Sequence, residues 1–183
     1  MEEGLFVAGE ATRGPRLTLV LGGARSGKSA YAESLVQAEP APWIYVATAQ
    51  GYDDEMRARI ADHRARRPAG WETRDAPRDL VGVLGATPPG RPVLVDCLTL
   101  WLSNALLDEA DLAAKTGALV AACTRHPGPL VLVSNEVGFG IVPDNALARR
   151  FRDEAGRLHQ RLAAIADRVV LVVAGLPLVV KGE

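Results

Sequence analysis

The chain has 183 residues, of which 48% are apolar and 23% charged, and its formal net charge is −1. This length and composition are typical of one globular domain with a single buried core, and a charge so close to zero argues against a nucleic-acid-binding protein. Cys97 and Cys123 are too few for a disulfide framework, which favours the cytoplasm, and no apolar run reaches the ~20 residues that span a membrane. We expect residues 1–15 to be a flexible N-terminal extension and residues 16–183 to form a single domain.

The first predicted strand, Leu17–Leu21, leads directly into a segment that matches the phosphate-loop pattern G-x-x-x-x-G-K-[ST]. Glycines let the backbone curl so that several N–H groups point at phosphate oxygens, and the helix that follows adds the positive end of its dipole. Lys28 can reach the terminal phosphates, and the Ser29 hydroxyl can bind Mg²⁺. The sequence therefore predicts a nucleoside triphosphate site formed by Gly22, Gly23, Ala24, Arg25, Ser26, Gly27, Lys28 and Ser29.

The second predicted strand, Trp43–Ala47, is followed by a highly charged segment over residues 53–68. Carboxylates come first and arginines last, which is typical of a solvated helix whose charges complement its dipole. However, His63 lies among these arginines, whose charge disfavours the imidazolium and keeps the ring able to attack phosphorus. A surface histidine and a catalytic histidine are both compatible with this pattern.

The third predicted strand, Pro92–Asp96, ends in a carboxylate, which phosphate-loop enzymes use to hold Mg²⁺, often through water. The fourth, Leu130–Ser134, leads into the loop Asn135–Pro143, which suits either a substrate-binding element or a plain connection into a helix. The fifth covers Val169–Val173. Helical segments alternate with these strands, so we expect an α/β fold of the P-loop NTPase (RecA-like) type, with a mainly parallel sheet and helices on both faces.

The clearest predicted helix begins after Asn145, a residue type that caps helix N-termini. We expect it to pack on the core through an apolar stripe with spacings of three or four residues. His159 lies within this helix and His126 lies in a turn, and we expect both to be structural. The stripe consists of Leu147, Phe151, Ala155, Leu158, Leu162 and Ile165.

From about Leu17 to Lys181 the chain resembles the bifunctional adenosylcobinamide kinase/adenosylcobinamide-phosphate guanylyltransferases of cobalamin synthesis. The resemblance rests on the phosphate loop together with other motifs, which in combination are far more specific than the loop alone. It implies phosphorylation of adenosylcobinamide by ATP or GTP, followed by GMP transfer from GTP to that phosphate. The other motifs are Tyr45–Gln50, Asp53–Met56, Arg59–Ile60, His63, Arg67–Pro68 before Trp71, Ser134–Pro143 and Arg149–Asp153.

The same resemblance implies roles for individual residues. His63 occupies the position of a histidine that carries GMP, Lys28 holds the β- and γ-phosphates, and Ser29 and Asp96 organise Mg²⁺. Asp75 stands where the family often has Glu, and its shorter reach is expected to alter that nucleotide contact. The resemblance also implies a homotrimer that acts on corrinoids, with no nucleic-acid or membrane partner. Further implied nucleotide contacts are Thr48, Ala49, Gln50, Arg64, Ala65, Arg66, Arg67 and Asp75.

Two other functions remain compatible with the phosphate loop. One is a small-molecule kinase that lacks the guanylyl step. Incubation with GTP labelled on its α-phosphate distinguishes it, because such a kinase would not acquire the label. The other is a recombinase-type ATPase acting on DNA, which requires a basic groove with interleaved aromatic residues. The near-zero net charge and the 5% aromatic content argue against this second alternative.

Overall fold

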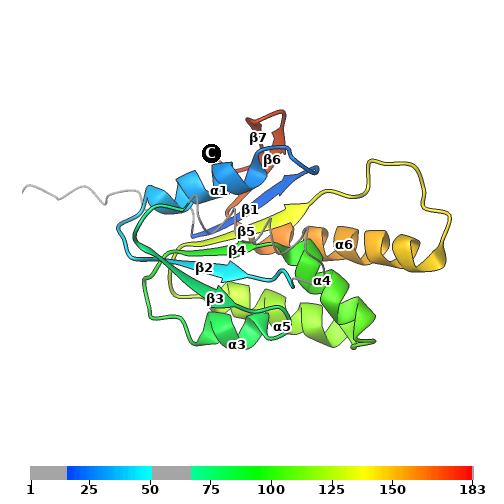
Figure 1. The fold of residues 1–183 in the computed structure, drawn as a ribbon, viewed down its shortest axis with the longest axis horizontal. Helices are drawn as coiled ribbons and strands as arrows, with labels where there is room; N and C mark the ends of the chain where they lie inside the picture. The colour runs from blue at the N-terminus through cyan, green and yellow to red at the C-terminus, as the bar shows by residue number, and fades with distance from the viewer. Residues whose placement is uncertain (1–15, 51–66, 183) are drawn as a thin grey trace, which may run out of the picture.

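The computed structural model of the chain describes residues 16–50 and 67–182, so the extension predicted over residues 1–15 lies outside the described residues. The centre of the described structure is one seven-stranded sheet in the order β3-β2-β4-β5-β1-β6-β7 (Figure 1). Neighbouring strands are parallel except β6 and β7. The strands are β1 Leu17–Gly22, β2 Trp43–Ala47, β3 Trp71–Asp75, β4 Val93–Asp96, β5 Leu130–Asn135, β6 Arg168–Val173 and β7 Leu176–Lys181.

Helices cover both faces of this sheet (Figure 1). Successive strand side chains point to opposite faces, so Leu19 and Leu132 join the larger core cluster while Val20 and Val133 join the smaller one. Residues of α1 contribute to the smaller cluster and residues of α3, α4, α5 and α6 to the larger. The predicted α/β fold, with a mainly parallel sheet and helices on both faces, is therefore confirmed. The described helices are α1 Lys28–Gln37, α3 Leu80–Gly85, α4 Leu98–Leu107, α5 Leu112–Arg125 and α6 Ala146–Ile165.

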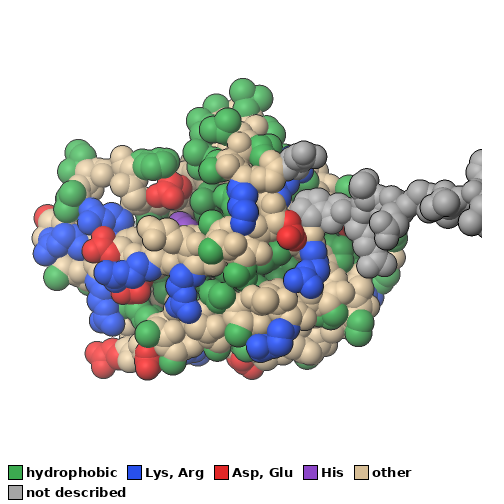
Figure 2. All heavy atoms as spheres, turned by 180° about the vertical axis from the view of Figure 1, so that it is seen from behind, with side chains coloured by type: hydrophobic (Ala, Val, Ile, Leu, Met, Phe, Trp, Pro, Cys, Tyr) green, Lys and Arg blue, Asp and Glu red, His purple; other side chains and the backbone are tan. Residues whose placement is uncertain are grey.

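Two strands, β3 and β7, are absent from the five that the sequence predicts. In β3 Glu72 and Thr73 are exposed, because the strand lies at one edge of the sheet and offers no apolar run. In β7 every residue is exposed, and Pro177 interrupts the pattern. Its exposed apolar side chains, which include Leu176 and Val180, contribute to the hydrophobic surface at the top of Figure 2. Both strands are at edges, where burial does not dictate composition.

The long predicted helix is present as α6, and its cap is as expected, with the side chain of Asn145 accepting the N–H of Ala148 at 2.7 Å. Most of the apolar stripe packs against the core, and Leu158 and Leu162 are fully buried. Leu147 is the exception, with 51% of its surface exposed. It lies in the first turn of α6, which extends beyond the edge of the sheet (Figure 1).

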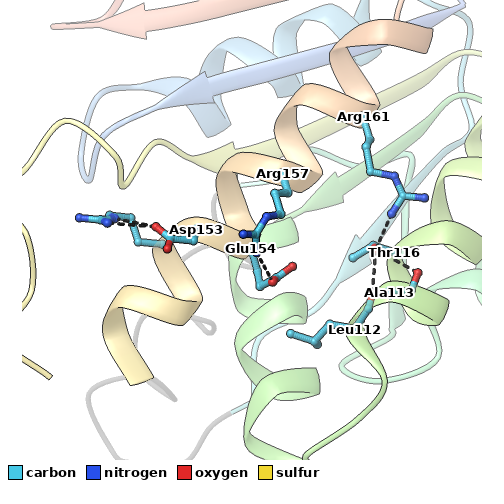
Figure 3. A network of polar contacts seen from close by, with 8 residues as sticks. Leu112, Ala113, Thr116, Asp153, Glu154, Arg157 and Arg161 are labelled. Carbon is cyan, nitrogen blue, oxygen red and sulfur yellow. Dashed lines mark hydrogen bonds and ion pairs between the residues drawn. The ribbon is translucent and has the colours of Figure 1, made fainter. Parts of the chain in front are cut away.

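A polar contact fixes α6 against α5. The guanidinium of Arg161 donates to the hydroxyl oxygen of Thr116 at 2.7 Å, and that hydroxyl donates to the carbonyl of Leu112 one turn earlier (Figure 3). Neighbouring charges on α6 instead pair along the same helix, as Arg157 does with Glu154. The register of α6 is thus defined by contacts on its buried side.

Candidate functional site

The glycine-rich segment turns from β1 into α1 at the carboxyl edge of the sheet. Gly27 has a φ of 93°, and a Cβ there would lie 3.2 Å from the Cα of Gly175. A Cβ on Gly22 would lie 2.7 Å from the carbonyl oxygen of Val172. The turn between β6 and β7 supports the loop, because the N–H of Gly175 donates to the carbonyl of Ser26 at 2.8 Å. Close approach and backbone conformation therefore require glycine at both loop positions.

Several polar groups of this loop are left for a ligand. Helix α1 begins without a side-chain cap, so its first N–H groups face the loop. Lys28 is buried, and its ammonium donates to the carbonyl of Gly23 at 3.1 Å. Among the described residues, the buried Oγ of Ser26 has no hydrogen-bond partner. Half-buried Ser29 follows in the first turn of α1. Free N–H groups, an ammonium and an unpaired hydroxyl fit a polyphosphate.

Asp96 ends β4, where it is paired in register with Ala47 of β2. The hydroxyl of Tyr45 donates to the Oδ2 of Asp96 at 3.1 Å. Burial, followed by the charge of Asp96, raises the pKa of Tyr45 above its usual range, so this phenol keeps its proton. The guanidinium of Arg67 lies 3.7 Å from the centre of the Tyr45 ring and donates to Thr73 at 3.1 Å. The structure thus brings Arg67 and Asp96 together at Tyr45, one over its ring and the other at its hydroxyl.

Asp96 and Ser29 are the residues that the sequence predicts to hold Mg²⁺, and both lie within the described part of the chain. Within residues 16–50 and 67–182, no group of three or more His, Cys, Asp and Glu side chains could bind a metal ion by itself. Mg²⁺ is ordinarily held by one or two carboxylates together with substrate phosphates and water. A single carboxylate beside a phosphate loop fits that requirement, since the phosphates supply the missing ligands.

Thr48 follows β2 and is completely buried. Its hydroxyl donates to the carbonyl of Cys97 at 2.7 Å and accepts the N–H of Cys97 at 2.8 Å, which ties the ends of β2 and β4 together. Ala49 and Gln50 come next and are half-buried. Asp75 ends β3 in register with Ala47 and is exposed. These predicted contacts therefore share the carboxyl edge with the phosphate loop, although the Thr48 hydroxyl is already occupied.

The remaining predicted residues, His63, Arg64, Ala65 and Arg66, lie outside the described residues. A second cluster at this edge is absent from the sequence predictions. Ser134 at the end of β5, Glu136 after it and His159 in α6 lie together, with the Nε2 of His159 2.7 Å from the Oγ of Ser134. The only sequence signal was the Asn-Glu pair opening a loop after a strand, because His159 is 25 positions away from Ser134.

Comparisons with known proteins identify relatives of this chain. A family model described as "Cobinamide kinase / cobinamide phosphate guanyltransferase" matches residues 18–180. The "Bifunctional adenosylcobalamin biosynthesis protein CobP" of Pseudomonas aeruginosa is 51% identical, over 90% of this chain and 97% of its own. The "Bifunctional adenosylcobalamin biosynthesis protein CobU" of Salmonella typhimurium is 46% identical, over 90% of this chain and 99% of its own.

Among solved structures, the RadB recombinase is similar with a TM-score of 0.46 and 18% identity, over 85% of this chain and 73% of its own. Within the part of the chain that the structure describes, no helix is long and apolar enough to cross a membrane.

Proposed function

Because the chain belongs to the family of cobinamide kinases and cobinamide phosphate guanyltransferases, we propose that one phosphate-loop site serves both of its activities. In the first, the site transfers a phosphoryl group from ATP or GTP to a hydroxyl of adenosylcobinamide. In the second, it transfers GMP from GTP to that new phosphate, which gives adenosyl-GDP-cobinamide and pyrophosphate. The single observation that carries this proposal is the open phosphate loop beside Asp96.

For phosphoryl transfer, the loop N–H groups and the ammonium of Lys28 neutralise charge on the β- and γ-phosphates. The hydroxyl of Ser26, unpaired among the described residues, points to a further contact with these oxygens. Asp96 and Ser29 hold Mg²⁺, which supplies additional charge stabilisation when bound. Tyr45 keeps Asp96 oriented by donating to Oδ2, which leaves the other carboxylate oxygen for the metal or its water.

For guanylyl transfer, a nitrogen of His63 attacks the α-phosphorus of GTP, and pyrophosphate leaves. An oxygen of cobinamide phosphate then attacks the same phosphorus and releases His63, so one difficult transfer becomes two. Arg64, Arg66 and Arg67 stabilise the charge that develops. Ala49, Gln50, Ala65 and Asp75 contact the nucleotide, and Thr48 acts by fixing the end of β2, since its hydroxyl is bonded to Cys97.

The proposal includes the setting in which the enzyme works. We place it in the cytoplasm as a homotrimer that acts on free corrinoids, without nucleic acid or a membrane. The support is the resemblance to bifunctional enzymes of cobalamin synthesis and the near-zero net charge of −1. Sedimentation of the purified protein tests the oligomeric state directly.

The experiment that tests the proposal uses GTP labelled on its α-phosphate, with Mg²⁺ and without corrinoid. Wild type should acquire a label that is lost in acid and stable in alkali, as expected of a phosphoramidate. His63→Ala should acquire none while it still phosphorylates cobinamide. A wild type that binds GTP without becoming labelled would support a kinase alone. A folded His63→Ala that lost both activities would make His63 a structural residue or a general phosphate contact.

A further inference from the structure

A buried polar cluster lies at the carboxyl end of β5, next to the phosphate loop. Ser134 is fully buried in β5, and His159 of α6 is 7% exposed. The Nε2 of His159 lies 2.7 Å from the Oγ of Ser134, and its Nδ1 lies 3.7 Å from the Oε2 of Glu136. Burial lowers the pKa of His159, although the charge of Glu136 opposes that shift. The ring therefore bridges a strand hydroxyl and a loop carboxylate.

The partners determine which nitrogen of His159 carries the proton. A neutral imidazole has one donor and one acceptor nitrogen. The nitrogen that faces the carboxyl group of Glu136 is Nδ1, at 3.7 Å and so beyond hydrogen-bonding distance, and we assign the N–H to it, with Nε2 accepting the hydroxyl of Ser134. This arrangement attracts the carboxylate of Glu136 toward α6 without requiring a second buried charge.

Glu136 connects this cluster to the phosphate loop. Its backbone N–H donates to the carbonyl of Gly22 at 3.0 Å, and its Oε1 accepts the N–H of Gly138 at 2.6 Å. The segment that follows β5 is therefore hydrogen-bonded to Gly22, the first glycine of the phosphate loop. It also turns so that Gly138 donates back to the carboxylate of Glu136. A Cβ on Gly138 would lie 2.8 Å from Oε1, so a side chain there would displace the carboxylate of Glu136 from this bond.

The loop held in this way carries unusually exposed apolar side chains. Phe139 is 84% exposed and Ile141 98% exposed, and Figure 2 shows hydrophobic side chains gathered on the connection between β5 and α6. Ligands of open α/β sheets bind beyond the carboxyl ends of the strands, which is where this loop lies. Exposed apolar groups that adjoin a polar site are typical of a ligand-binding wall.

We propose that His159 is a positioning residue for the acceptor substrate. It holds Glu136 against the phosphate loop, so that Phe139 and Ile141 receive the apolar edge of the corrinoid while its hydroxyl faces the terminal phosphate. The inference rests on the proposed phosphate-loop site for the kinase step. A macrocycle is the occupant that this wall suits, because the acceptor must lie against the loop to reach the phosphate, and none of the residues that we assign to the nucleotide lies in this wall.

The test compares His159→Gln with His126→Gln. His126 is the matched control, because it is also buried and lies before the other end of β5, where its ring nitrogens contact Thr87 at 3.0 Å and Gly128 at 3.1 Å. Steady-state phosphorylation is measured with cobinamide varied and then with nucleotide varied. His159→Gln should raise the KM for cobinamide about tenfold and change the nucleotide KM by less than about twofold. His126→Gln should change neither.

A second pair of variants does not depend on the folding of a core mutant. Phe139→Ser and Ile141→Ser alter exposed side chains, and each should raise the cobinamide KM by a similar factor. Equal increases in both KM values, or no increase in either, would overturn the inference. So would a change of oligomeric state in Phe139→Ser with an unchanged cobinamide KM, because the wall would then contact a second copy. If wild type neither binds nucleotide nor phosphorylates cobinamide, the failure belongs to the proposed function instead.

Discussion

The two edges of the sheet satisfy their polar groups in different ways. At the amino edge, His126 is bonded to Thr87 and Gly128, and the ammonium of Lys181 donates to the carbonyl oxygens of Ala163 and Ala164 at 2.9 and 3.2 Å. These groups find their partners within the fold. At the carboxyl edge, α1 starts without a side-chain cap, and the buried hydroxyl of Ser26 has no partner among the described residues. Two buried donors at the amino edge, the Nε1 of Trp71 and the Nε of Arg168, also lack a partner among the described residues. What distinguishes the carboxyl edge is that its open hydroxyl lies in a glycine loop at the uncapped start of a helix, where a phosphate can bind.

Burial and pKa alone would not have revealed this difference. His126 and His159 are both buried, and burial lowers the pKa of each. What separates them is the identity of their partners. His126 contacts a turn, whereas His159 faces the carboxylate of Glu136, a residue whose backbone N–H donates to Gly22 of the phosphate loop. A perturbed histidine thus becomes informative only when the groups that it holds are followed to their own contacts.

The largest contrast between the edges should come from their lysines. Lys28→Ala removes the ammonium that covers the phosphate loop, and we expect both activities to fall by about 10³-fold or more, with little change in the melting temperature. Lys181→Ala removes an ammonium that binds the last carbonyls of α6 and should cost about 1 kcal/mol of stability or less, with both activities intact. Phosphorylation and guanylyl transfer by the two purified variants provide the measurement. Retention of either activity by Lys28→Ala would refute the single shared site.

A smaller contrast should come from two glycines with positive φ. Gly27→Ala introduces a side chain at a φ of 93° and 3.2 Å from Gly175, so we expect a loss of about 2 kcal/mol together with weaker nucleotide binding. Gly90 precedes β4 at the amino edge with a φ of 78°, and a Cβ there would meet nothing within 4 Å. Gly90→Ala should cost about 1 kcal/mol through conformation alone. Urea unfolding measures the stability of the two variants, and nucleotide titration measures their affinity. If both variants bound nucleotide equally well, Gly27 would have no special role in the phosphate loop.

The sequence predicts the parts of this molecule that depend on local pattern. Near-continuous apolar runs indicate the five interior strands, and the spacing of the glycines with Lys28 predicts the phosphate loop. The edge strands β3 and β7 are not predicted, because their side chains face solvent and burial does not require them to be apolar. Contacts such as Tyr45 with Asp96, or Ser134 with His159, join residues 51 and 25 positions apart. Only the order of strands and the register of α6 bring these side chains together.

The smallest contrast concerns pH, and here the two histidines should behave alike. Because burial holds the pKa of each below the ordinary value of about 6.5, the unfolded chain takes up a proton at a higher pH than the native protein does. The unfolded state then binds more protons, so stability falls as the pH is lowered from 7.5 to 5.5, by at most about 1.4 kcal/mol per pH unit for each histidine.

His126→Gln and His159→Gln should each flatten this dependence to a similar extent in urea unfolding at the two pH values. Only His159→Gln should also raise the cobinamide KM, since only that ring reaches Glu136. If the slope of stability against pH stayed the same in both variants, the two rings would be titrating normally in the native protein. If both variants flatten the pH dependence of stability equally and only His159→Gln raises the cobinamide KM, then burial affects the two histidines alike. The two edges then differ only in that the carboxyl edge binds the acceptor.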